Sequence, residues 1–160
     1  MKTASLKEIK TELENVPPQE LLLLCLRLAK FKKENKELLN YLLFESTDEQ
    51  EYVKGVNEML GEIFLTVNTK NIYFARKTIR KIIRTANRYI KYSPAETTET
   101  EILLFVCEKI NSLQINLKKN TALLNLYLSL IKRINKSVNA MHEDMQYDYN
   151  KAVENLSVNL

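Results

Sequence analysis

The chain has 160 residues, of which 45% are hydrophobic and 28% are charged, and its formal net charge is +4. It contains only two glycines and three prolines, and because tight turns between strands draw on glycine for positive φ, all-β and α/β folds are disfavoured. We therefore predict an all-α fold, a multi-helix bundle of six or seven helices that forms one domain over residues 1–160.

The N-terminal ten residues contain no apolar run, so no signal peptide is predicted. The most apolar stretch, residues 21–31, is too short to span a membrane and contains Arg27. Cys25 and Cys107 both lie in apolar helical runs, where a free thiol behaves as a small hydrophobic residue. We expect a cytoplasmic protein that has no membrane span and no disulfide framework.

Capping signals place the first two helices. Ser5 and Glu8 form a capping-box pattern, which predicts a helix that runs to about Asn15. Pro17 and Pro18 end it, and Pro18 suits the first turn of the next helix. We expect this second helix to be central and well buried, because apolar residues lie on more than one of its sides: Leu21, Leu22, Leu24, Cys25, Leu28 and Phe31.

Two further helices follow in the sequence. Asn35 is expected to cap a short helix, and Thr47 with Gln50 repeats the capping pattern before a longer one. This longer helix contains both glycines, Gly55 and Gly61, each of which costs about 1 kcal/mol relative to Ala in a helix interior. We expect either a closely approaching neighbouring helix or a kink to account for them.

Residues 71–92 form the most distinctive stretch, which we predict to be one long amphipathic helix. One side is apolar, through Ile72, Ala75, Ile79, Ile82, Ile83, Ala86, Tyr89 and Ile90. The other side is basic, and we name it the basic face: Arg76, Lys77, Arg80, Lys81, Arg84, Arg88 and Lys91, with Tyr73 among them. No acidic residue occurs between Glu62 and Glu96, and this window holds eight positive charges, so the remainder of the chain carries −4. Such segregated charge produces a local field that a polyanion would feel.

Several interpretations of the basic face are open. It is a solvated helix surface, or it pairs with acids elsewhere in the chain, such as those of residues 45–51 or 96–101. Alternatively it binds the phosphates of a nucleic acid, with Tyr73 and Tyr92 stacking on unpaired bases. Binding to an anionic membrane is the weakest interpretation, because the Ile-rich and Ala-rich apolar side suits a protein core.

The C-terminal half is also predicted to be helical. Thr98 with Glu101 is expected to cap a sixth helix. Polar and apolar residues then alternate over residues 112–118, which we interpret as an extended connector packed on the bundle. Asn120 is predicted to cap a last helix that continues to the C-terminus. Its apolar seam is long enough to pack in a bundle or to form a homodimer: Leu124, Tyr127, Ile131, Ile134, Val138, Met141 and Met145.

An internal repeat would relate two multi-helix halves of the chain. Residues 21–25 resemble residues 103–107, and residues 54–59 resemble residues 136–141, at the same offset of 82 positions. Residues 32–40 resemble residues 118–125 at a slightly larger offset, so the order of the matches is kept. We treat this duplication as a hypothesis, because Leu-rich helices also match one another by chance.

The sequence lacks most catalytic motifs. Two glycines, both in one predicted helix, cannot form a Walker loop or a dinucleotide-binding loop. The single histidine, His142, excludes a multi-histidine zinc site. Asp144 and Asp148, one helical turn apart, are weak candidates for holding a hard cation, and a solvated helix end is the favoured alternative.

We therefore expect a non-enzymatic interaction or adaptor protein that needs no cofactor and binds through its basic face. Its partner would be an acidic protein surface or a nucleic acid. The alternative of a magnesium-dependent hydrolase requires carboxylates to converge, and pairs such as Glu34 with Glu37 or Glu45 with Asp48 have the spacing for this.

Overall fold

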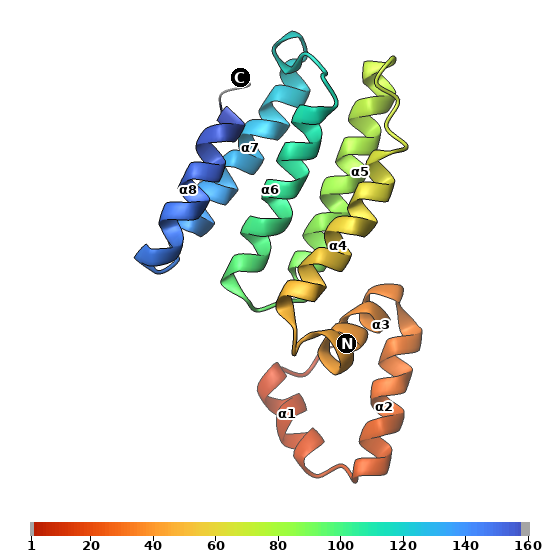
Figure 1. Cartoon of the computed structure of the whole chain (residues 1–160). Coiled ribbons are helices and arrows are strands. Elements are labelled where there is room, and N and C mark those ends of the chain that lie inside the picture. Colours follow the sequence, from red (N-terminus) through yellow and green to blue (C-terminus); the bar gives the residue numbers. More distant parts are fainter. Residues whose placement is uncertain (1, 158–160) are drawn as a thin grey trace. The chain divides into compact units, whose positions relative to one another are not determined.

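In the computed structural model, which describes residues 2–157, every regular element is helical (Figure 1). This confirms the all-α class, although the described residues form eight α-helices rather than six or seven. The chain divides into two compact units: unit 1 ends at Phe44 and unit 2 begins at Glu45. Within the described residues no helix is long and apolar enough to cross a membrane.

Unit 1 contains α1 (Leu6–Glu14), α2 (Pro18–Phe31) and α3 (Lys33–Asn40), and the π-helical turn η1 (Tyr41–Glu45) follows α3 directly. The capping box is confirmed: the Ser5 hydroxyl accepts from the Glu8 amide, and the Glu8 carboxylate accepts from the Ser5 amide at 2.7 Å. The prediction that Asn35 caps α3 is wrong. It lies inside the helix, and its side-chain amide donates to the Leu28 carbonyl at 2.8 Å.

The expectation that α2 is central and well buried is wrong. None of α1, α2 and α3 contains a buried residue, and Leu22, Leu23, Leu28 and Phe31 of α2 are each at least 60% exposed. Three short helices in a unit of this size share too little surface to enclose a core. The abundance of leucine therefore did not indicate burial in this part of the chain.

Unit 2 contains the buried core. It is built from α4 (Glu49–Phe64), α5 (Ile72–Ile90), α6 (Glu96–Ser112), α7 (Thr121–Val138) and α8 (Glu143–Ser157), with a 3₁₀ turn, η2 (Leu117–Lys119), before α7. Helix α6 packs against α4, α5, α7 and α8 (Figure 1). It buries residues around more than half of its circumference, among them Ile102, Leu103 and Cys107, which are fully enclosed. A helix apolar on several sides belongs at the centre of a bundle.

Helix α5 has the predicted amphipathic arrangement. Its buried residues are Ala75, Ile79, Ile82, Ile83 and Ala86, five of the eight assigned to its apolar side. The spacing by three and four places them in one stripe against α4 and α6. The opposite side of α5 is therefore left for the basic residues.

The helix starts in unit 2 depart slightly from the capping patterns. Asp48, not Thr47, caps α4, and its carboxylate accepts from the Glu51 amide at 3.0 Å. Thr98 does not cap α6, which begins two residues earlier at Glu96. Thr98 is buried inside the helix, where its hydroxyl donates to the Glu49 carboxylate of α4. A threonine that bonds to another helix cannot be told from a capping threonine by spacing alone.

The alternating segment at residues 112–118 does not form a strand. Helix α6 ends at Ser112, and Gln114 then adopts a left-handed backbone conformation with φ 54°, which turns the chain away from the helix axis. Ile115 is half-buried and Leu117 is buried, so the alternation reflects a connector that packs its apolar side chains on the bundle.

The predicted last helix is two helices, α7 and α8, separated by a turn at residues 139–142. No glycine or proline marks this turn, so the break was missed. His142 supplies the carbonyl that accepts from the Met145 and Gln146 amides, and Glu143 and Asp144 occupy the first turn of α8, where the helix dipole favours acids. Tyr127, Ile131, Ile134, Val138 and Met141 of the seam are buried within unit 2, and homodimerisation through this part stays a prediction.

The structure lends no support to an internal duplication. Residues 21–25 lie in α2, which buries none of its residues, whereas residues 103–107 lie in the buried centre of α6. Residues 54–59 lie inside α4, whereas residues 136–141 cross the end of α7 and the turn after it. Matched segments of a true repeat would be expected to occupy equivalent positions.

The two glycines of α4 offer a test of helix energetics. A Cβ added at Gly55 would meet no atom within 4 Å, and one added at Gly61 would lie 3.7 Å from the Phe105 ring, an ordinary contact. Neither glycine is required by close helix packing. We predict that Gly55→Ala raises the free energy of unfolding by about 0.5–1 kcal/mol, measured by urea denaturation, with Gly61→Ala as the matched comparison. Destabilisation by Gly55→Ala would show that this position needs glycine for another reason.

The buried core predicts a loss of stability at high pH. Burial, followed by the nearby Glu108 charge, raises the pKa of Cys107 to about 12, and burial, with the Cys107 charge, raises the pKa of Tyr127 to about 12. The unfolded chain ionises these groups at about pH 8.5 and 10, so their stabilising contribution is complete below pH ~8.5 and is lost as pH rises toward 12.

For each group the predicted decline is about 1.4 kcal/mol per pH unit above its unfolded pKa. Denaturant titrations between about pH 7 and 11 test this, with Cys107→Ala as the control. In that variant the decline should begin at the unfolded pKa of tyrosine, not that of cysteine. Identical pH profiles of the two proteins would contradict the assignment.

Candidate functional site: a cationic groove between α5 and α7

The basic residues are positioned by a securely capped helix. The Asn71 side chain accepts from the backbone amides of Tyr73 and Phe74 at 3.0 and 3.3 Å, which fixes the first turn of α5. From this start, Arg76, Arg80 and Arg84 recur at intervals of four residues. They therefore form a row along one side of α5, with a rise of about 6 Å from one arginine to the next.

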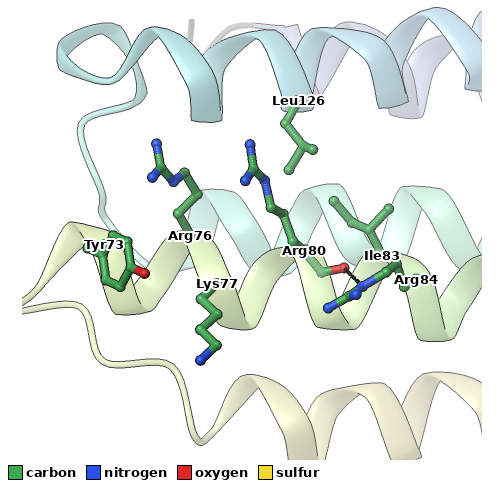
Figure 2. A pocket seen from close by; sticks show the side chains of 7 residues that line it. All are labelled: Tyr73, Arg76, Lys77, Arg80, Ile83, Arg84 and Leu126. Carbon is green, nitrogen blue, oxygen red and sulfur yellow. Dashed lines mark hydrogen bonds between the residues drawn. The ribbon is translucent and has the colours of Figure 1, made fainter.

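A groove of about 510 Å³ lies beside this row (Figure 2). Figure 2 shows the guanidinium groups of Arg76 and Arg80 extending toward α7, from which Leu126 points back at them. We call this the cationic groove. Its lining holds four cations and no acid: Tyr73, Arg76, Lys77, Arg80, Ile83, Arg84 and Leu126.

Five of the eight residues assigned to the predicted binding surface line the cationic groove: Tyr73, Arg76, Lys77, Arg80 and Arg84. Lys81 and Lys91 are exposed on α5 and at its end but do not line it. Arg88 also lies outside the groove. It is half-buried, its guanidinium carbon lies 5.2 Å from the centre of the Tyr89 ring, and its Nε is shielded from solvent.

No acidic side chain forms an ion pair with Arg76, Lys77, Arg80, Lys81 or Arg84 in the described part of the chain. Their recorded contacts are local: the Arg84 Nε donates to the Arg80 carbonyl at 3.4 Å, and the Arg76 guanidinium lies 5.8 Å from the centre of the Tyr73 ring. The pairing interpretation of the basic face is therefore not supported for these residues.

Two of the acids proposed as internal partners contact other helices of unit 2. Glu49 accepts from Thr98, and Glu101 accepts from the Tyr149 hydroxyl at 2.8 Å. Burial, followed by the hydrogen bond to Glu101, raises the pKa of Tyr149 well above its usual range, so this hydroxyl remains a donor. The acidic part of unit 2 thus stabilises contacts between other helices, and the cations of the groove are left to face solvent.

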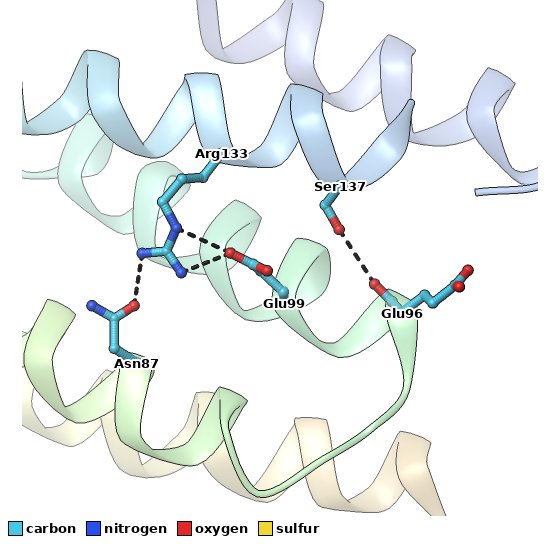
Figure 3. Close-up of polar contacts among 5 residues, drawn as sticks. All are labelled: Asn87, Glu96, Glu99, Arg133 and Ser137. Atoms are coloured by element: carbon cyan, nitrogen blue, oxygen red, sulfur yellow. Dashed lines mark hydrogen bonds and ion pairs between the residues drawn. The ribbon is translucent and has the colours of Figure 1, made fainter. Parts of the chain in front are cut away.

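Arg133 of α7 joins three helices of unit 2. Its Nε and Nη2 donate to one oxygen of Glu99 on α6 at 3.0 and 2.7 Å, and its Nη1 donates to the Asn87 side chain on α5 at 2.7 Å (Figure 3). The nearby Ser137 hydroxyl of α7 donates to the Glu96 carbonyl at 3.4 Å. These bonds link α7 to both α6 and α5. They therefore support the two walls of the cationic groove.

Sequence reasoning missed the apolar part of the groove. Ile83 was assigned to the apolar side of α5, and it is indeed 8% exposed while also lining the groove. Leu126 comes from α7, and no periodicity within α5 could reveal it. Nothing in the sequence indicated the contacts of Arg133 either, because its partners lie 34 and 46 positions away.

A second pocket, of about 520 Å³, lies between α4 and α6 and has a different character. Its lining includes the cations Lys54 and Lys109 but also the acids Glu58 and Glu101. Lys54 already pairs with Glu51 at 3.1 Å, and Lys109 lies over the Phe105 ring. Mixed charge of this kind gives no strong preference for an anion.

The weak metal candidates do not form a site in the described residues. His142 Nδ1 lies 3.2 Å from the Asp144 carboxylate, but both side chains are largely exposed, and Asp148 is exposed as well. Among residues 2–157 no three His, Cys, Asp or Glu side chains lie close enough together to hold a metal ion. The described residues therefore offer no such group in support of the hydrolase alternative.

Comparison of the chain with protein-family models, with curated proteins and with solved structures found no match. The functional interpretation therefore depends on the geometry and charge of the cationic groove itself.

We predict that Arg133→Met lowers the free energy of unfolding by about 1 kcal/mol, because the charged hydrogen bonds to Glu99 and Asn87 are lost at a site only partly shielded from water. Methionine keeps much of the aliphatic packing of the arginine. Lys132→Met, at the exposed neighbouring position, is the control for loss of one charge from α7. Equal stability of the two variants would mean that the Arg133 contacts contribute nothing.

Proposed function

We propose that this protein is a non-enzymatic interaction protein that binds an anionic macromolecule in its cationic groove. One observation carries the proposal: a row of cations lines a groove and has no acidic partner in the described part of the chain. Side chains that already neutralised one another would offer little to a ligand. In the cationic groove the four positive charges are available to a ligand.

The unbound arrangement has an energetic cost that a ligand would remove. Arg76 with Arg80, Arg80 with Arg84, and Lys77 with Lys81 are like-charged pairs at a spacing of four residues. Each such pair destabilises a helix by about 0.2–0.5 kcal/mol at low salt. An anion lying along the row would attract each of these cations and so offset their mutual repulsion, which gives the charge pattern a role that a merely solvated helix surface lacks.

The groove favours recognition over catalysis. Its polar lining consists of permanently charged arginines, a lysine and a tyrosine, whereas general acid–base chemistry usually depends on His, Asp or Glu. Arg and Lys groups in a concave surface are suited to binding phosphate or carboxylate groups. An adaptor role follows if the bound anion belongs to a larger partner.

The proposal predicts salt-sensitive binding of polyanions. Polyglutamate, heparin and a labelled oligonucleotide would be titrated with the protein at about 50 and 200 mM salt, and at least one should bind more weakly at the higher salt. Arg80→Glu/Arg84→Glu should reduce its affinity at least about tenfold, because two attractive charges become repulsive.

A matched control carries the same change of net charge outside the groove. Lys136→Glu/Lys151→Glu alters exposed residues of α7 and α8 that do not line it, so this variant should bind nearly as well as the unmodified protein. Circular dichroism would verify that both variants fold. The proposal is wrong if no polyanion binds at low salt, or if both double variants lose affinity equally.

A further inference from the structure

The lining of the cationic groove combines charge with a flat aromatic surface and apolar walls. Four cations are joined there by Tyr73, Ile83 and Leu126. A carboxylate-rich protein surface would satisfy the cations but would leave the aromatic and aliphatic surfaces without a use. A nucleotide carries both an anionic phosphate and a planar base, so it complements both kinds of surface.

Tyr73 is placed to stack on a base. Its ring is 60% exposed at one end of the groove, and the Arg76 guanidinium lies 5.8 Å from its centre. Phe74 packs edge-on against it with ring centres 5.6 Å apart, which limits the positions that the tyrosine can take. A base that stacked on Tyr73 would bring its phosphate within the reach of Arg76 and Arg80.

The shape of the groove favours a single strand. Arg76 and Arg80 extend from α5 toward α7, into a space of about 510 Å³ that is also lined by Leu126 (Figure 2). This volume is similar to that of sites for small ligands, so it accommodates a short piece of an extended strand. The convex cylinder of a duplex would rest on the rims of the groove, away from Leu126 and Ile83.

We infer that the cationic groove binds single-stranded nucleic acid, with a base stacked on Tyr73 and successive phosphates along Arg76, Arg80 and Arg84. This inference rests on the proposed function and names its ligand. The row of arginines along α5 suits a linear backbone. Because the arginines are assigned to phosphates and the lining contains no Asn or Gln, we expect little dependence on base sequence.

The experiment uses the full-length protein and fluorescence anisotropy. Labelled 12-nucleotide strands of oligo-dT and oligo-U would be compared with a 12-base-pair duplex and with polyglutamate at about 50 mM salt. Single strands should bind at least about tenfold more tightly than the duplex or polyglutamate. With three phosphate contacts, the slope of log affinity against log salt should be about −2 for a single strand, and Arg80→Gln should reduce its magnitude by about 0.7.

The stacking contact is tested by three tyrosine variants. Tyr73→Leu should weaken single-strand binding by about 5- to 150-fold, whereas Tyr73→Phe keeps an aromatic face and should bind within a few-fold of the unmodified protein. Tyr147→Leu is the control, because Tyr147 is 74% exposed on α8 and does not line the groove. A difference between Leu and Phe at position 73 cannot come from charge.

The outcomes separate this inference from the proposed function. If duplex or polyglutamate binds as tightly as the single strands, or if Tyr73→Leu binds unchanged, the inference is overturned while the proposed function stands. If no polyanion binds even at low salt, both this inference and the proposed function are wrong. Tight single-strand binding that Tyr73→Leu weakens and Tyr73→Phe retains would support the inference.

Discussion

Burial of α6 is the constraint on which the rest of unit 2 depends. Because α6 is apolar around most of its circumference, it must be covered on several sides, and α4, α5, α7 and α8 supply that cover. The position of α5 on one flank of α6 follows from its isoleucine stripe, and its basic residues must then face away from the core. The groove between α5 and α7 exists because both helices pack on the same central helix and are joined through Arg133.

The polar network of unit 2 separates two uses of charge. Glu49, Glu99 and Glu101 make contacts between helices, each through a hydroxyl or a guanidinium group on a neighbouring element. In the described part of the chain, the cations that line the groove, Arg76, Lys77, Arg80 and Arg84, make none of these contacts. These three carboxylates thus stabilise contacts between helices, whereas the cations of the groove face solvent, where a ligand could bind them.

The helical class and about half of the helix starts could be predicted from local signals. The Ser5–Glu8 box and the cap at Asn120 depend only on neighbouring residues, and each is present in the structure. The predictions were wrong where contacts between helices, and not neighbouring residues, determine the role of a side chain. Thr98 bonds to another helix instead of capping its own, and the leucines of α2 resemble core residues in sequence but have no core to enter. The turn between α7 and α8 lacks glycine and proline, and the apolar periodicity continues across it, so the two helices were predicted as one.

The candidate site was half predictable for the same reason. The basic row lies on one helix, so its spacing was legible in the sequence, and five of the eight named residues share the groove. Leu126 and Arg133 come from α7, more than forty positions beyond the middle of α5, and only packing brings them near it. Arg88 shows the opposite limit: it has the right spacing, but it is half-buried beside Tyr89 and does not line the groove.

The exposed leucines of α2 have a consequence for the behaviour of the protein in solution. Apolar side chains at the surface promote weak, non-specific self-attraction, and α2 presents several of them in a short stretch. Glu20, Arg27 and Lys30 are interspersed among them, and charges of this kind oppose such attraction. Colloidal stability should therefore be set largely by unit 1, and an exchange of Leu22 or Leu23 for a polar residue would change solubility more than it changes the fold.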